Sequence, residues 1–312
     1  MFFARMMNTF TGMMGGATSD ATATPLVASA ISLPSFFVIG PPRTGTSWLH
    51  QVLKDHAHLP RATKETHFFD KHFHRGLAWY RGHYDPAPPG KRMGEVAPTY
   101  FACEAARDRI ARITPDAKVV CILRNPLERL LSLYRLKSAY GVIRYSLEHA
   151  LERDPELLES SLYATKLKGW YRALGPEQVL VTFYDDLRDR PQYFVNAMAD
   201  FVGLPRFTLR PVDANYVNAS NGMTYPRHYY FARLATIMAS WCKSQRLNRI
   251  VTAAKSSSLP KLFMGGGQPF AQMSPEMSLK LAEILRPEMD ELEVMLNRDF
   301  SAWKAPVQQL VA

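Results

Sequence analysis

The sequence predicts an α/β fold with a central parallel sheet flanked by helices and a helical C-terminal part. Four apolar runs have strand character, and segments with helical spacing follow them, which is the pattern of parallel strands joined by crossover helices. Beyond Pro211 the strand pattern stops and helical patterns continue. A chain of 312 residues that is 47% hydrophobic and 21% charged has the composition of a globular protein.

The expected elements follow from local patterns. Strands are expected at 36–39, 94–97, 118–123 and 178–184, and helices over 45–56, from 126 onward, and over 145–152, 162–173 and 191–202. Residues 227–250 carry apolar side chains at helical spacing, which predicts a helix with a core-facing stripe of Tyr230, Leu234, Ile237, Met238 and Trp241. Ser274 and Pro275 should begin a last helical region, which Pro287 should divide or kink.

The predicted domain organisation is one domain at 34–305 after a flexible tail at 1–33, which is rich in Met, Thr, Ala and Gly. Whether this tail is a targeting peptide stays open. The uncharged window 21–42 contains a strand and is otherwise too short and polar for a transmembrane segment. Three cysteines without paired spacing predict neither a disulfide framework nor a zinc site, and we therefore expect a cytoplasmic protein.

The formal net charge of +10 is concentrated in one part of the chain. Residues 214–275 contain no Asp or Glu, and their basic residues are Arg227, Arg233, Lys243, Arg246, Arg249, Lys255 and Lys261. This distribution indicates an anionic partner, with a solvated basic helix face as the alternative. Nucleic acid is not expected because no recognised binding module accompanies the charge.

The most specific local motif is GPPRTGTSW at 40–48, where a strand ends in a glycine-containing loop that opens a helix. Free backbone N–H groups and the helix dipole converge at such a point and bind phosphate. The spacing approaches that of a Walker A loop, but Thr46 stands where the lysine is required. This substitution argues against ATP or GTP hydrolysis.

A second phosphate motif follows the strand at 118–123. Arg124 ends that strand, Asn125 and Pro126 fit a helix start, and Ser132 lies in the second turn of the helix. An arginine and a serine in these places can share one phosphate, the first by charge and the second by its hydroxyl donor.

The two motifs together resemble those of the PAPS-dependent sulfotransferases, PAPS being 3'-phosphoadenosine-5'-phosphosulfate. The resemblance implies a P-loop-type fold in which Arg43 replaces the usual lysine of the 5'-phosphosulfate loop. The residues it assigns to that loop are Arg43, Thr44, Gly45, Thr46 and Ser47. Trp48 matches a tryptophan that stacks on adenine, with core packing as the alternative, and Arg124 and Ser132 match the 3'-phosphate site.

Two further segments extend the resemblance, towards the heparan-sulfate-type sulfotransferases and their bacterial relatives. KETHFFD at 64–70 implies that Glu65 is the general base and that His67 and Asp70 shape the site. In an extended segment Glu65 and His67 would point to the same side. GEVAPTY at 94–100 departs from the family at Val96, where several members have a lysine, and the glycines at 265–267 lack the family's arginine.

The resemblance implies sulfuryl transfer from PAPS to a hydroxyl or amine by in-line displacement, with no metal required. The histidines at 67, 72 and 74 are interpreted as scattered rather than as a metal site. Two alternatives stay open: another P-loop enzyme such as a nucleotide kinase, which the missing Walker lysine disfavours, and a non-catalytic nucleotide-binding module, which Glu65 and Arg43 disfavour. The sequence leaves the acceptor class open among a small molecule, a lipid and a glycan, whether anionic or neutral.

Overall fold

The structure is a computed structural model that describes residues 32–86, 90–214, 224–244, 251, 254, 266–270 and 272–306. Nearly all of the predicted tail lies outside these residues. The same holds for Arg246, Arg249, Lys255 and Lys261 of the basic segment. The architecture below concerns the described residues alone.

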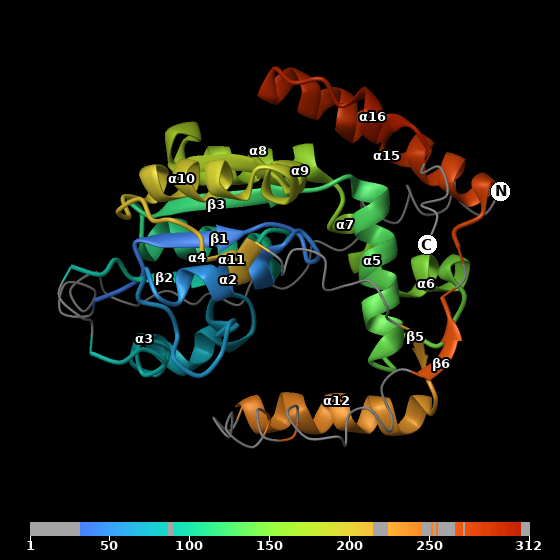
Figure 1. The fold of residues 1–312 in the computed structure, drawn as a ribbon, viewed down its shortest axis with the longest axis horizontal. Helices are drawn as coiled ribbons and strands as arrows, with labels where there is room; N and C mark the ends of the chain where they lie inside the picture. The colour runs from blue at the N-terminus through green and yellow to red at the C-terminus, as the bar shows by residue number, and fades with distance from the viewer. Residues whose placement is uncertain are drawn as a thin grey trace. The chain divides into compact units, whose positions relative to one another are not determined.

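A four-stranded parallel sheet forms the centre of the fold, as the sequence predicts (Figure 1). Its strands, in the spatial order β2-β1-β3-β4, are β1 (Phe36–Ile39), β2 (Gly94–Val96), β3 (Lys118–Leu123) and β4 (Val179–Phe183). In β1, β3 and β4 apolar residues supply side chains for both faces of a buried sheet, whereas β2 has the sequence Gly-Glu-Val. In register, Phe36 lies between Gly94 and Lys118.

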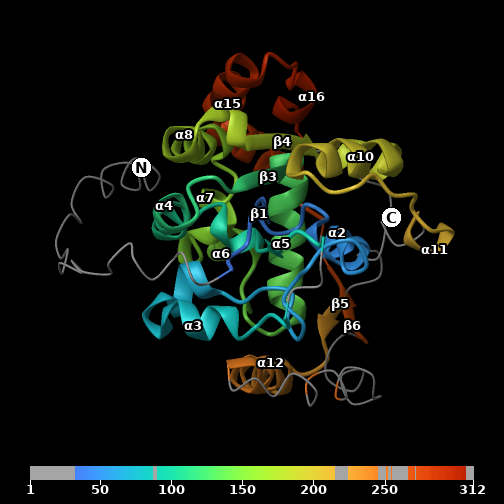
Figure 2. The ribbon, with the colours of Figure 1, turned by 90° about the vertical axis from the view of Figure 1, so that its left-hand side faces the viewer.

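Helices cover both faces of this sheet. One face carries α2 (Thr46–Leu53), α9 (Tyr184–Asp189) and α10 (Pro191–Val202), and the other carries α4 (Glu104–Ile113), α8 (Tyr163–Leu174), α15 (Pro275–Leu296) and α16 (Ser301–Lys304). Figure 2 shows α2 and α10 on the side of the sheet opposite α4 and α8. Alternate residues of β1 belong to the two layers: Phe36 and Val38 pack with α2 and α10, whereas Phe37 and Ile39 pack with α4 and α8.

A third apolar cluster surrounds α5 (Pro126–Ala139), the helix that follows β3. It also includes α6 (Leu147–Arg153), α7 (Glu156–Glu159) and part of α15. Asn125 caps α5 as expected, accepting hydrogen bonds from the backbone N–H groups of Leu127 and Glu128 at 3.0 and 3.2 Å. The helix α15 runs unbroken through Pro287, so the expected division into two short helices is wrong.

Short elements complete the described chain. They are η3 (Phe68–His72), η4 (Phe73–Arg75), α3 (Gly76–Arg81), η5 (Pro98–Tyr100), η6 (Pro176–Gln178), α11 (Pro211–Ala214), β5 (Thr224–Pro226), α12 (Tyr229–Ser244) and β6 (Gly266–Pro269). The strands β5 and β6 pair antiparallel, which corrects the expectation that no strand follows Pro211. Both strands are very short and contain proline, and β6 contains glycine, so neither shows the apolar alternation that identifies a strand.

The apolar stripe of α12 does not face the core, and that prediction is wrong. The exposed fractions are 79% for Tyr230, 53% for Leu234, 50% for Ile237, 57% for Met238 and 59% for Trp241. The opposite side of the helix contacts the protein instead: Ala232 is fully buried, and the Thr236 hydroxyl donates to the carbonyl of Tyr140 at 3.0 Å. Helical spacing identifies an apolar face but does not show what covers it.

No described helix is both long enough and apolar enough to cross a membrane.

We call the segment 64–70 the strap. The sequence predicts an extended strap, but the structure shows that it is not extended. His67 has a left-handed backbone with φ 53°, and η3 is a π-helical turn that begins at Phe68. A buried carboxylate on β2 anchors the strap, because Glu95 accepts hydrogen bonds from the N–H and the hydroxyl of Thr66 at 2.8 and 2.7 Å. Tyr80 donates a further bond to Glu95 at 2.7 Å.

Glu95 therefore has an unusual environment for a carboxylate. Burial raises its pKa, while the hydrogen bonds from Tyr80 and Thr66 act in the opposite direction. A buried acid with several donors holds its surroundings in one arrangement, since each donor would lose its partner if the strap moved.

We predict that Glu95→Ala lowers the free energy of unfolding by about 2–4 kcal/mol, because it leaves buried donors without an acceptor. Urea denaturation followed by circular dichroism measures this loss. The control is Glu104→Ala, which removes a 67%-exposed carboxylate paired with Lys166 at 3.6 Å. That change should stay within about 0.5 kcal/mol. Equal stability losses in the two variants would contradict an anchoring role for Glu95.

Candidate active site

Two loops meet at the carboxyl edge of the sheet because they follow the adjacent strands β1 and β3. The first loop needs glycine at its start: Gly40 has φ 135°, and a Cβ there would lie 2.5 Å from the carbonyl oxygen of Ile122. Thr44 is fully buried and donates its hydroxyl to the carbonyl of Pro41 at 3.0 Å, which closes the loop on itself. Gly45, with φ 86°, then leads into α2.

Arg43 links the two loops. Its backbone has φ 83°, a left-handed conformation that costs on the order of 1–3 kcal/mol for a residue with a side chain. Its Nε donates to the hydroxyl oxygen of Ser132 on α5 at 2.9 Å. The structure therefore places the Arg43 guanidinium beside the second phosphate motif, although the sequence assigned this residue to the first.

Arg124 lies beside Arg43 and is held from several sides. Its guanidinium stacks over the Tyr184 ring at 4.6 Å and pairs with Glu128 at 2.9 Å, and it donates to the carbonyl oxygen of Arg43 at 3.4 Å. Burial, and then the neighbouring Arg124, lower the pKa of Arg43. No described carboxylate lies within ion-pair distance of Arg43, and Glu128 pairs with Arg124 alone, so the two adjacent guanidinium groups carry excess positive charge and the site fits an anion.

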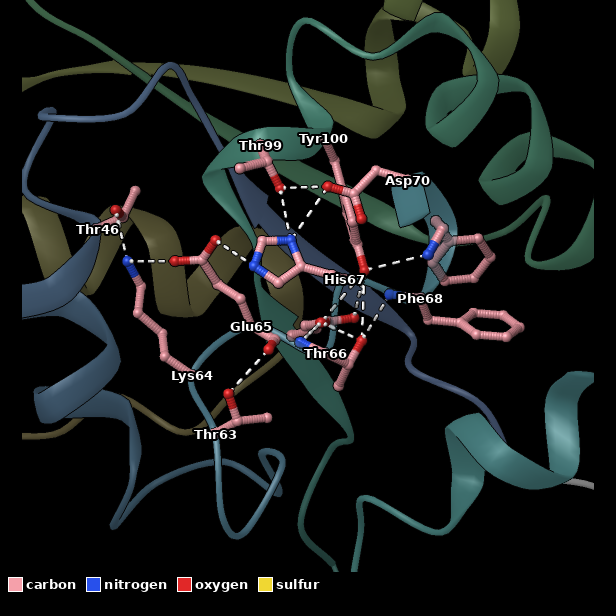
Figure 3. A network of polar contacts seen from close by, with 12 residues as sticks. Thr46, Thr63, Lys64, Glu65, Thr66, His67, Phe68, Asp70, Thr99 and Tyr100 are labelled. Atoms are coloured by element: carbon pink, nitrogen blue, oxygen red, sulfur yellow. Dashed lines mark hydrogen bonds and ion pairs between the residues drawn. The ribbon is translucent and has the colours of Figure 1, made fainter. Parts of the chain in front are cut away.

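The strap brings a second group of polar side chains to the first loop, as Figure 3 shows. The Lys64 ammonium donates to the hydroxyl oxygens of Thr46 and Ser47 at 3.0 and 3.2 Å. It also lies 3.4 Å from Oε1 of Glu65, whose Oε2 is 3.8 Å from Nε2 of His67. Glu65 and His67 thus face each other, although the strap is not a strand.

The Asp70 carboxylate fixes the orientation of the His67 ring. Its Nδ1 lies 3.2 Å from Oδ2 of Asp70, and that oxygen accepts a 2.8 Å hydrogen bond from the Thr99 hydroxyl. Burial raises the pKa of Asp70, but the hydrogen bonds from His67 and Thr99 outweigh it and hold the pKa below the usual value. Asp70 therefore stays ionised and fixes the imidazole with Nε2 towards Glu65.

Trp48 is placed in the core layer of α2. It is 4% exposed, its ring lies 6.5 Å from that of Phe194, and its indole N–H donates to the carbonyl of Asp213 at 2.6 Å. These contacts are those of the alternative interpretation, core packing. Stacking of Trp48 on adenine stays a prediction.

Three residues that shape this site were not predicted from the sequence, namely Lys64, Glu95 and Thr99. Lys64 begins the KETHFFD segment, and its contact with the loop joins positions 18 residues apart, which no local pattern indicates. Glu95 and Thr99 belong to GEVAPTY at 94–100, a segment that resembles the family. A polar residue inside a short buried strand was the available signal for Glu95.

The comparisons with known proteins define the class. The sulfotransferase domain family matches residues 33–220, well over half of the chain, and the chain belongs to this family. This assignment confirms the predicted class, PAPS-dependent sulfotransferases.

The particular relatives include mouse heparan sulfate glucosamine 3-O-sulfotransferase 3A1, with 30% identity over 210 residues, 62% of this chain and 53% of the relative. Mouse heparan sulfate glucosamine 3-O-sulfotransferase 6 is 31% identical over 198 residues, 61% of this chain and 57% of the relative. The chain thus spans about half the length of these curated relatives. A sulfotransferase structure from Alicyclobacillus acidocaldarius shares the fold, with TM-score 0.63, 20% identity, and coverage of 88% of this chain and 100% of that one.

We predict that Arg124→Ala raises the dissociation constant of 3'-phosphoadenosine-5'-phosphate at least about tenfold, since a charge-assisted phosphate contact contributes roughly 1.5–3 kcal/mol. Ser132→Ala removes a neutral donor and should weaken binding by a smaller factor. Isothermal titration calorimetry measures both constants. Arg206→Ala, which removes an exposed guanidinium paired with Asp200, is the control and should bind like wild type. Unchanged affinity in both site variants would refute the 3'-phosphate assignment.

Proposed function

We propose that this protein transfers a sulfuryl group from PAPS to a hydroxyl or amine of an acceptor, and that residues 34–305 form its catalytic domain. Glu65 is the general base in this proposal. The observation that carries it is the position of the Glu65 carboxylate, which lies between the loop-bound ammonium of Lys64 and the Nε2 of His67.

The phosphate sites divide the donor between two loops. The hydroxyls of Thr46 and Ser47 and the N–H groups that open α2 suit the phosphosulfate end. Arg124 and Ser132 suit the 3'-phosphate. Thr44 and Gly45 shape the turn that leads from the first loop into α2. Catalysis then comes from holding donor and acceptor in line and from stabilising charge as it develops.

The chemical step is a single displacement at sulfur. The acceptor oxygen or nitrogen forms a bond to sulfur while its proton passes to Glu65. The bond from sulfur to the bridging oxygen breaks, and its electron pair stays on the 5'-phosphate of the leaving nucleotide. His67, fixed by Asp70, keeps the Glu65 carboxylate directed at the acceptor.

The acceptor class is part of the proposal. The relatives are named for glucosamine in heparan sulfate, so a sugar hydroxyl or amine is one candidate. Val96 is fully buried and stands where several polysaccharide sulfotransferases have a lysine. The acceptor panel that we propose to test therefore also includes small alcohols and lipids. Radiolabelled PAPS with such a panel, analysed by mass spectrometry, identifies the product.

A cytoplasmic location is also proposed. It is supported by Cys103, Cys121 and Cys242, all of which are free thiols.

We predict that Glu65→Gln lowers kcat by about 10²–10⁴, the usual contribution of a positioned base, while PAPS affinity changes only a few-fold. The amide keeps the shape of the side chain but cannot take the proton. Steady-state kinetics with the acceptor identified above, together with calorimetry, measure the two effects. Glu283→Gln, an exposed change on α15, should leave both unchanged. Near-normal turnover in Glu65→Gln with an inactive His67→Ala would assign the base to His67 instead.

A further inference from the structure

The helix α12 presents large apolar side chains away from the protein. Each of these side chains is at least half exposed, and together we call them the α12 stripe: Tyr230, Leu234, Ile237, Met238 and Trp241. They recur at spacings of three and four residues, so they form one continuous strip along the helix. In Figures 1 and 2, α12 lies at the edge of the fold, at the end opposite α15 and α16. A contiguous exposed apolar surface of this kind marks an interaction site.

The loop between α5 and α6 continues this surface beyond the helix. Its side chains Val142 and Tyr145 are each 40% exposed, while Ile143 is 4% exposed and belongs to the apolar cluster around α5. Arg144 joins the loop to the stripe, because its Nη1 donates to the Tyr230 hydroxyl at 3.4 Å. Its guanidinium carbon lies 5.6 Å from the centre of the Tyr230 ring. The surface therefore combines two segments that are far apart in the sequence.

Positive charge flanks the stripe. Arg144, Arg227 and Arg233 are all exposed. Arg227 lies just before α12, and Arg233 lies within it, beside stripe residues three and four positions away. The recorded contact of Arg227 is with an uncharged group, the carbonyl of Gly266, at 3.3 Å. Because residues 214–275 contain no Asp or Glu, α12 and its neighbours in the sequence supply no charge that would neutralise these arginines.

We propose that the α12 stripe and its flanking arginines dock this protein on a membrane surface that carries anionic lipids. The apolar side chains of such a helix enter the boundary between head groups and acyl chains, while arginines at its flanks bind lipid phosphates. Tyrosine and tryptophan, which the stripe contains, prefer this boundary. With 16 residues, α12 is too short to span a bilayer and suits a position along its surface. This inference goes beyond the proposed function and does not depend on its chemistry.

Charge disfavours a second copy of the chain as the occupant of this surface. In a symmetric pair the same surface faces itself, so the arginines of both copies would be brought together. Residues 214–275 offer no carboxylate to separate them, and like charges that meet across an interface oppose association. Anionic head groups neutralise the same arginines, and this complementarity favours the membrane.

Co-sedimentation with vesicles tests the apolar part of the proposal. The probes are vesicles of phosphatidylcholine alone and of an equimolar mixture of phosphatidylcholine and phosphatidylglycerol. The wild-type protein should bind the anionic vesicles at least about tenfold more strongly, and salt should weaken this binding. Leu234→Gln combined with Ile237→Gln should lower the partition coefficient on anionic vesicles at least about tenfold. The matched control combines Leu279→Gln with Val294→Gln, two exposed positions on α15, and should bind like wild type.

A second pair of variants tests the charged part. Arg144→Gln combined with Arg233→Gln should remove most of the preference for anionic vesicles and leave binding to neutral vesicles unchanged. The control combines Arg188→Gln with Arg206→Gln, two arginines that pair with Asp189 and Asp200, and should keep the preference. Loss of the preference in the control alone, or in neither variant, would contradict docking through these arginines.

Three results would overturn the inference as a whole: wild-type protein that stays in the supernatant with anionic vesicles, equal binding to both kinds of vesicle, or equal losses in the α12 and α15 variants. Analytical ultracentrifugation examines the second copy. A wild-type dimer that becomes monomeric in the Leu234→Gln, Ile237→Gln variant would assign the stripe to self-association instead. If circular dichroism shows that this variant does not fold, Tyr230→Ser, at the most exposed stripe position, replaces it. Unchanged vesicle binding in that variant would equally refute docking through the stripe.

Discussion

The contact between Glu95 and Thr66 is the constraint on which the site depends. Two donors of a single residue in the strap, its backbone N–H and its hydroxyl, are fixed on a carboxylate inside the sheet. With Thr66 held inward, its neighbours Glu65 and His67 project outward together, where their side chains approach within 3.8 Å. The network in Figure 3 therefore begins in the core and ends at the loop, where Glu65 pairs with Lys64 and His67.

The sheet and the two phosphate motifs were predictable because each is a local pattern. A buried strand, a glycine or an arginine at its end, and a helix start lie consecutively in the sequence, and parallel pairing brings such strand ends to one edge. The direction of the Arg43 side chain was not predictable, since it follows from a left-handed backbone that residue preferences disfavour. The contact of Lys64 with Thr46 was missed because it depends on how the strap folds, and the strap was expected to be extended.

The helix α12 illustrates a different limit of sequence patterns. Its periodicity is regular, and the helix forms as expected, but small residues make the contact with the protein and large apolar residues face away. Gly141 permits this close approach, because a Cβ there would lie 2.7 Å from the carbonyl oxygen of Tyr229. A hydrophobic stripe thus gives the orientation of a helix only when the surface opposite it is large enough to bury it.

The arrangement of the strap has a consequence for control of the chemistry. Lys64 and Glu65 are consecutive residues, so the ammonium that contacts the first loop and the carboxylate proposed as the base are carried by one short piece of backbone. A displacement of that piece would withdraw both at once and leave a donor that is bound but inert. Protection of an energy-rich sulfate against transfer to water would then follow from the covalent adjacency of two side chains, and a separate lid would not be required.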